Sequence, residues 1–132
     1  MRLSAVLVTY NSSGVLEACW RSLRSLIPDA EIIVVDKSAA ALDLTRQWGV
    51  DHPVLADGTH IDKVKEITNG QGAEVIVDFV GEQGAQEDAV KMLKRAGSHF
   101  IIGYGGSLNV PTIDIISAEI NFIGNLVGTD ND

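Results

Sequence analysis

The sequence predicts a single α/β domain, in which helices cover both faces of a doubly wound parallel sheet of about six strands, giving three layers. Two observations predict it: short apolar runs alternate with segments of helical periodicity, and no linker or low-complexity tract divides the 132 residues. A chain of this length can form one hydrophobic core and is too short for two domains. We therefore expect residues 1–132 to form one domain.

The predicted strands are short, nearly continuous apolar runs, as expected of parallel strands that are buried on both faces. They cover residues 3–9, 31–36, 52–55, 74–81, 98–106 and 120–128. Crossover helices between parallel strands are right-handed, which favours the strand order 3-2-1-4-5-6. The predicted fold is therefore Rossmann-like.

The predicted helices show apolar residues at three- and four-residue spacing and recognisable ends. They cover residues 16–27, 38–48, 61–67, 85–93 and 113–117. Pro28 ends the first helix, because proline cannot continue it. Ser38 is placed to cap the second helix, and Gly49 is placed to stop it. Gly97 is expected to end the fourth.

Composition and charge exclude several classes of function. The formal net charge is −8 and the ten Lys and Arg residues are scattered, which argues against nucleic acid as a partner. No apolar run is long enough to span a membrane. Cys19 is the only cysteine, so an internal disulfide and a cysteine-rich zinc site are excluded. A reduced cytoplasmic compartment, or recombinant expression, fits these features.

From about residue 30 onward the chain resembles the NAD-binding domain of zinc-type medium-chain alcohol dehydrogenases. The resemblance is carried by "IIVVDKSAAALDLTRQWGVDHPVLADG", "VKEITNGQGAEVIVDFVG" and "GSHFIIGYGGSLNVPTIDIISAEINFIGNLVGT". These segments follow one another in the order of the family and without large gaps. The resemblance implies a cofactor domain that binds NAD.

Residues 1–27 resemble a different family. The run "VLVTYN" is similar to the first strand of family 2 glycosyltransferases, and "EIIVVD" is similar to their second strand. We therefore expect a chimera, engineered or recombined, in which a glycosyltransferase-like segment 1–29 joins a dehydrogenase-like domain 30–132. A natural dehydrogenase whose first segment has drifted is the alternative.

The loop after the first strand lacks most of the glycines of a dinucleotide-binding motif. In G-x-G-x-x-G the glycines make the turn, admit the pyrophosphate and let helix and strand pack closely. With the spacing of the family these positions fall on Ser12, Gly14 and Glu17, so only the middle glycine is kept. Ser12 still fits an N-cap. Glu17 would either oppose an anionic pyrophosphate or point to solvent and complement the helix dipole.

Asp36 is the best single candidate for binding, because an acid at the end of the second strand accepts hydrogen bonds from ribose hydroxyls and disfavours a 2′-phosphate. Lys37 is a weaker candidate beside it. The resemblance adds the turns after the later strands. These are Phe79, Val80 and Gly81; Gly103, Tyr104 and Gly105; and Leu126 and Val127. The alternative for the glycines is that they serve backbone conformation first.

A complete active site is not found. The dehydrogenases that the chain resembles hold a catalytic zinc in a separate domain, whereas His52, His60 and His99 have no ligand-like spacing. His99 is expected to be a packed or edge residue, and Cys19 a small core residue rather than a nucleophile. The only match to the Asp-x-Asp motif of glycosyltransferases is 130–132, which chance explains. We therefore predict no catalytic and no metal-binding residue.

The preferred hypothesis is an isolated Rossmann-like domain without catalysis of its own and with at most weak affinity for NAD. One alternative is a competent nucleotide-binding module, for NAD or a uridine nucleotide, that needs a separate catalytic domain. Another is a structural scaffold that binds no nucleotide. By resemblance, the last strand is also a candidate for pairing in a homodimer, and its exposed apolar edge is an aggregation risk.

Overall fold

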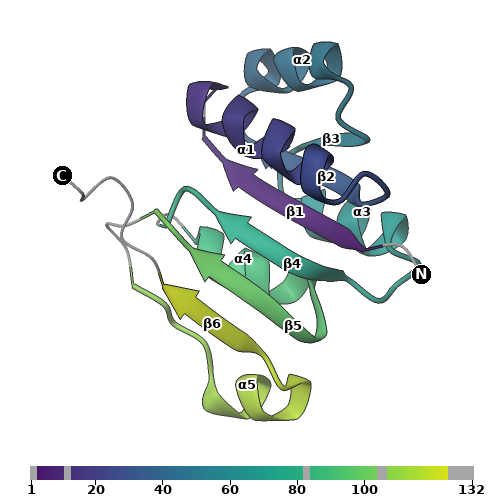
Figure 1. Cartoon of the computed structure of the whole chain (residues 1–132). Helices are drawn as coiled ribbons and strands as arrows, with labels where there is room; N and C mark the ends of the chain where they lie inside the picture. The colour runs from purple at the N-terminus through teal and green to yellow at the C-terminus, as the bar shows by residue number, and fades with distance from the viewer. Residues whose placement is uncertain (1–2, 11–12, 82–83, 104–106, 125–132) are drawn as a thin grey trace, which may run out of the picture.

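The computed structural model describes residues 3–10, 13–81, 84–103 and 107–124, and its elements are shown in Figure 1. The strands are β1 (Ser4–Thr9), β2 (Glu31–Asp36), β3 (His52–Leu55), β4 (Ala73–Asp78), β5 (Leu93–Ile101) and β6 (Asn121–Gly124). The helices are α1 (Ser13–Leu26), α2 (Ala39–Trp48), α3 (His60–Ile67), α4 (Ala85–Met92) and α5 (Thr112–Ala118).

The strands form one sheet in the order β3-β2-β1-β4-β5-β6, and every neighbouring pair is parallel. The predicted order 3-2-1-4-5-6 is confirmed. From β1 the chain first builds outward through β2 and β3, and then returns to place β4 on the other side of β1. The topological switch point therefore lies between β1 and β4, with all carboxyl ends at one edge of the sheet (Figure 1).

Helices cover the two faces of the sheet in pairs, because alternate side chains of a strand point to opposite faces. Val6, Val8 and Ile76 belong to the apolar cluster on which α3 and α4 pack. Leu7 and Ile32 belong to the other cluster, which α1 and α2 cover. Figure 1 shows α1 in front of the sheet and α3 and α4 behind it.

The predicted ends of the second helix are confirmed. The Ser38 hydroxyl accepts a hydrogen bond from the Ala41 N–H, and Gly49 ends α2 in the left-handed conformation at φ 87°. An L residue with a side chain rarely adopts that conformation, so the glycine is required there.

The segment between α1 and β2 is fixed by Arg24. Its guanidinium donates to the carbonyls of Pro28 at 2.7 Å and Ala30 at 2.9 Å, and to the Asp51 carboxylate at 2.6 Å. The same group lies 4.7 Å from the ring centroid of Trp20. The boundary between the two predicted segments of the chain is therefore closed by hydrogen bonds and an ion pair.

The predicted boundary between α4 and β5 is wrong. The helix ends at Met92 rather than near Gly97, and β5 begins at once with Leu93. Leu93 is buried and pairs with Ala73, and the pairing then passes to Ser98 while β4 advances only to Val75. Burial of Leu93 draws the chain into the sheet early, and residues 94–97 form an irregularity of the strand.

Two other predicted strands end differently. The strand expected over 74–81 is Ala73–Asp78, and the one expected over 98–106 ends at Ile101. The last strand is described from Asn121 to Gly124 only.

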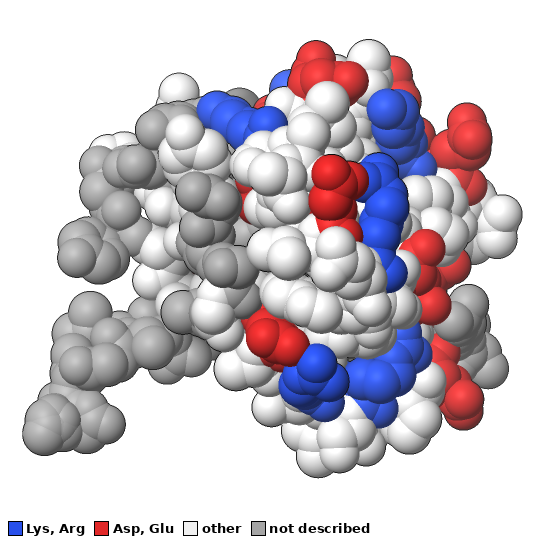
Figure 2. Space-filling model, turned by 90° about the horizontal axis from the view of Figure 1, so that it is seen from above, with Lys and Arg blue, Asp and Glu red and all other residues white. Residues whose placement is uncertain are grey.

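One face of the molecule is mixed in charge. Figure 2, which looks onto the side of α1 and α2, shows acidic and basic side chains interspersed there rather than gathered by sign. Within the described ranges, none of the helices combines the length and the apolar character that crossing a lipid bilayer requires.

Candidate functional site

A pocket of about 240 Å³ opens at the carboxyl ends of the central strands, next to the switch point between β1 and β4. Its walls come from the ends of β1, β2 and β4, from the segment between β3 and α3, and from α4. Its apolar lining includes Val8, Val35, Ala56, Val80, Ala85 and Met92, and its polar lining includes Thr9, Lys37, His60 and Asp88. Open parallel sheets bind ligands at this position, outside the carboxyl ends of the strands.

Asp36 ends β2 beside this pocket and is completely buried. One carboxylate oxygen accepts a hydrogen bond from the Thr9 hydroxyl at 2.7 Å, and the other accepts one from the Ser38 N–H at 2.7 Å. The sequence predicted this carboxylate as an acceptor for ribose hydroxyls. Both carboxylate oxygens are thus engaged by groups of the chain itself, and the carboxylate joins the end of β1 to the start of α2.

Gly14 lies in the first turn of α1, where a Cβ would meet no atom within 4 Å. The packing of the residues that the structure describes therefore does not require a glycine at this position. Ser12, the other candidate of the loop, lies outside the described residues. The open space beside Gly14 is what a pyrophosphate needs at the start of this helix.

Glu17 forms an ion pair with Arg21 on the surface of α1, with 2.7 Å between the carboxylate oxygen and the guanidinium nitrogen. The pair joins residues four positions apart on one face of the helix. Glu17 also lies beyond the first turn of α1, which contains no acidic residue. This geometry fits the solvent-facing interpretation of Glu17 better than a charge aimed at a phosphate.

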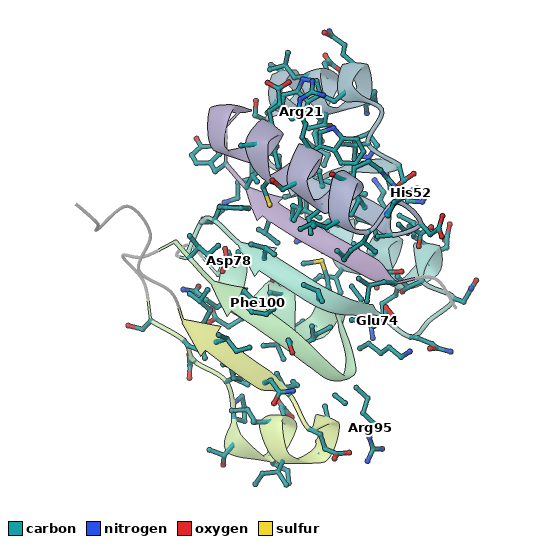
Figure 3. All side chains as sticks on the ribbon, viewed as in Figure 1. Arg21, His52, Glu74, Asp78, Arg95 and Phe100 are labelled. Atoms are coloured by element: carbon teal, nitrogen blue, oxygen red, sulfur yellow. The ribbon has the colours of Figure 1, made fainter. Side chains whose placement is uncertain are left out.

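The turn after β4 is held by Asp78, which is completely buried. One of its carboxylate oxygens accepts hydrogen bonds from the N–H groups of Val80 at 2.9 Å and Gly81 at 3.0 Å. Figure 3 shows Asp78 at the carboxyl end of β4, with Glu74 toward the other end of the strand. This turn presents Val80 to the pocket, and Gly81 provides a φ of 68°.

Gly103 serves close packing rather than backbone conformation. Its Cβ would lie 2.4 Å from the carbonyl carbon of Val80 and 2.6 Å from that of Phe79. Its N–H donates to the Asp78 carbonyl at 3.0 Å. The end of β5 therefore lies directly against the turn that lines the pocket. Tyr104, Gly105, Leu126 and Val127, the remaining candidates of these turns, fall outside the described residues.

Each histidine lies beside a carboxylate of another element. His52 is 3.0 Å from Glu31, and His60 is 3.1 Å from Asp88. His99 is completely buried, 3.6 Å from an oxygen of Asp78, with its ring centroid 5.6 Å from that of Phe122. The prediction of a packed His99 is confirmed.

Within residues 3–10, 13–81, 84–103 and 107–124, no group of three or more His, Cys, Asp or Glu side chains is placed to hold a metal ion. Cys19 is half-buried on α1, and this burial raises the pKa of its thiol, which disfavours the reactive thiolate. The Asp-x-Asp match at 130–132 lies beyond the described part of the chain. The described residues thus do not fit a zinc ion.

Four polar residues of the site were missed from the sequence: Thr9, Tyr10, His60 as a lining residue, and Asp88. Thr9 is separated from its partner Asp36 by 27 positions, and His60 from Asp88 by 28. For Thr9 a signal existed, since the last residues of parallel strands share one edge of the sheet. For His60 and Asp88 no local pattern indicates that α3 and α4 meet.

The family model described as zinc-binding dehydrogenase matches residues 27–132. An NAD-dependent alcohol dehydrogenase of Sulfolobus acidocaldarius is 32% identical over 103 residues, covering 76% of this chain and 29% of that protein. An NAD-dependent alcohol dehydrogenase of Saccharolobus solfataricus is 24% identical over 96% of this chain and 37% of its own length. The chain thus spans 29% to 37% of the length of these curated relatives.

The alcohol dehydrogenase of Aeropyrum pernix superposes with a TM-score of 0.82 at 35% identity, over 97% of this chain and 37% of that one. The likeness to dehydrogenases therefore extends into residues 1–29, although the family model begins at residue 27. A glycosyltransferase-like origin of that segment, and with it a chimera, has no support in these relatives. The chain belongs to the zinc-binding dehydrogenase family and corresponds to the Rossmann-type NAD-binding domain of that family.

Proposed function

We propose that this chain binds the adenosine part of NAD weakly at the carboxyl ends of β1, β2 and β4. The observation that carries the proposal is the pocket beside the switch point, with Asp36 at its edge. Its apolar lining suits a flat base, and its polar lining suits the sugar. Asp36 would hold the ribose hydroxyls, and Lys37 and Val80 would flank the nucleotide.

Weak affinity follows from the loop before α1. Of the three glycine positions only Gly14 is kept, so the pyrophosphate has less close backbone to bind. The helix N-terminus still attracts an anion, because its first turn presents free N–H groups and no acidic side chain. The glycosyltransferase-like origin of residues 1–29 stays a prediction, and it would explain why the loop before α1 keeps only one of the three glycines.

Hydride transfer between an alcohol and NAD is proposed for a longer protein rather than for these residues alone. The relatives with that printed activity are far longer than the segment matched here. Bound NAD would supply the hydride acceptor, and the chain would supply its position. Because the described residues do not fit a zinc ion, no step through a metal is derived from them.

Nucleotide binding can be tested by two-dimensional amide NMR during separate titrations with NAD⁺, NADP⁺ and UDP. We expect saturable shifts with NAD⁺ at Gly14, Asp36 and Val80, and weaker binding of NADP⁺, because Asp36 repels a 2′-phosphate. A tighter response to UDP would favour the uridine nucleotide as the ligand. Spectra in which no amide peak shifts with any of the three ligands would contradict the proposal and favour a structural scaffold.

Replacing Gly14 by alanine separates binding from folding. We expect roughly ten-fold weaker NAD⁺ binding, because a methyl group would occupy space that the pyrophosphate needs. The free energy of unfolding should not fall, since the methyl group meets no atom of the described residues within 4 Å and alanine is the better helix former. Calorimetry with NAD⁺ checks the first result and urea denaturation the second. Adenosine, which lacks the pyrophosphate, is the control ligand and should bind both proteins equally.

We further propose that the chain self-associates as a homodimer through β6, the edge strand of the sheet. The surface beside it is apolar: Ile113 and Ile116 of α5 are 65% and 70% exposed, and Ile123 of β6 is 39% exposed. Light scattering should give the mass of a dimer, and Ile123→Lys should give a monomer, because a charge at an edge strand opposes pairing. A monomer of the unmodified chain at every concentration would contradict this proposal.

A further inference from the structure

We propose that Asp88, held in place by His60, makes the pocket selective for a purine base with an exocyclic amino group, so that adenine is bound in preference to hypoxanthine. The inference rests on the proposed nucleotide binding and adds to it the part of the ligand that is recognised. The two side chains concerned both lie in the lining of the pocket.

The pair connects the two helices that cover one face of the sheet. His60 is the first residue of α3 and Asp88 lies in α4, with 3.1 Å between the ring Nε2 and the carboxylate Oδ2. The side chain of His60 is 8% exposed, whereas that of Asp88 is 39% exposed. Both line the pocket. The carboxylate is therefore anchored at one oxygen and still open to a ligand.

The hydrogen bonds of His60 determine what the pair offers. The Gly58 N–H donates to the ring Nδ1 at 3.3 Å, so this nitrogen acts as an acceptor and the neutral ring has its proton on Nε2. That proton is donated to Asp88. The ring therefore has no donor left for a ligand, and the pair presents carboxylate oxygen only. Among the described residues, the second oxygen of Asp88 has no partner.

The segment that carries Gly58 is itself fixed. The Asp57 carboxylate accepts hydrogen bonds from the Thr59 hydroxyl at 2.6 Å and from the Thr59 N–H at 2.9 Å. The Thr59 side chain is also the main cause that lowers the pKa of Asp57, followed by its backbone N–H. Because Asp57 stays ionised, the segment keeps its shape at neutral pH, and the His60 ring is held toward Asp88 before any ligand arrives.

Because the His60–Asp88 pair presents only hydrogen-bond acceptors, it discriminates between purines by the group at position six of the ring. Adenine has an amino group there, which can donate to Asp88, whereas hypoxanthine has a carbonyl oxygen, which would face the carboxylate with no proton between them. The other polar lining residues, Thr9, Tyr10 and Lys37, lie at the ends of β1 and β2 rather than on α3 and α4, so the pair itself offers the carbonyl no donor. The Asp88 side chain is 39% exposed, so water can still reach its second oxygen, and we expect a moderate rather than a strong rejection of hypoxanthine.

The test compares AMP with its hypoxanthine counterpart IMP, by calorimetry or by amide NMR on the chain as it is. The two ligands share ribose and phosphate, so that only the base differs. We expect AMP to bind roughly ten-fold more tightly, as a hydrogen bond to a charged group implies. This comparison needs no variant and therefore does not depend on how a substitution affects folding.

Two variants then assign the preference to a residue. Asp88→Asn keeps the shape but can present an amide donor, so the preference for AMP should vanish or reverse. Asp62→Asn makes the same change of charge on the exposed part of α3, outside the pocket lining, and should keep the preference. Thermal unfolding of both variants checks that they remain folded.

The outcomes are distinct. Equal affinity of the unmodified chain for AMP and IMP, or an undiminished preference in Asp88→Asn, would overturn the base selectivity and leave nucleotide binding intact. If neither AMP nor NAD⁺ binds at millimolar concentration, the proposed function and the selectivity both fail.

Discussion

Gly103→Ala is expected to lower the free energy of unfolding by about 3 kcal/mol, at the upper end of the usual cost of overpacking. The added methyl group would lie 2.4 Å from the carbonyl carbon of Val80 and 2.6 Å from the carbonyl oxygen of Phe79. Both obstacles are backbone atoms of a turn that Asp78 holds with two hydrogen bonds, so they cannot turn aside as a flexible side chain would. Urea denaturation followed by circular dichroism measures the change.

Gly124→Ala is the matched control. Gly124 is the last residue of β6, and a Cβ there would meet no described atom within 4 Å. Its substitution should change the free energy of unfolding by less than about 0.5 kcal/mol, as is usual for open surface positions. Equal effects of the two substitutions would show that β5 does not approach the turn after β4 as closely as described.

The substitution Gly103→Ala is also expected to affect the pocket. If the turn after β4 must move to admit the methyl group, Val80 moves with it and the pocket changes shape. Gly103 therefore supports the pocket by allowing close packing behind it, and contact with a cofactor is not needed to explain the glycine.

Much of the fold could be predicted because its signals are local. The second helix shows this best: Ser38 and Gly49 mark its ends in the sequence, and both do so in the structure. The strand order could be predicted as well, because alternating strands and helices allow few right-handed, uncrossed arrangements.

The boundary between α4 and β5 could not be predicted, because its cause is not local. Residues 85–93 show helical spacing, and Gly97 resembles a stop signal. The chain nevertheless leaves the helix at Met92, because Leu93 pairs with Ala73. Gly72, next to Ala73, permits this pairing: a Cβ there would lie 2.8 Å from the backbone of Leu93. No pattern within the helix contains that information.

The candidate site divides in the same way. Asp36 and Val80 follow from the rule that ligands meet the carboxyl ends of parallel strands, and the structure places both beside the pocket. The partners of these residues do not follow from it. Whether Glu17 faces a phosphate depends on the direction of its side chain, which the sequence does not determine. The structure shows that this side chain pairs with Arg21.

Asp36→Asn is expected to have two effects that come from one carboxylate. The free energy of unfolding should fall by about 2 kcal/mol, because a hydrogen bond to a charged acceptor is lost in a site that water does not reach. The Thr9 hydroxyl and the Ser38 N–H both need an acceptor, and asparagine offers one oxygen where aspartate offers two. The preference for NAD⁺ over NADP⁺ should also disappear, since the negative charge that repels a 2′-phosphate is gone.

Thr9→Val separates the two effects. It removes one donor to Asp36 and keeps the carboxylate, so stability should fall by about 1 kcal/mol while the preference for NAD⁺ remains. Denaturation and competitive titration with NAD⁺ and NADP⁺ measure the two quantities on each variant. If Asp36→Asn loses stability but keeps its preference, the carboxylate only joins β1, β2 and α2, and the ribose lies elsewhere. If it loses the preference and Thr9→Val does not, the same buried acid both holds the strand ends together and recognises the sugar.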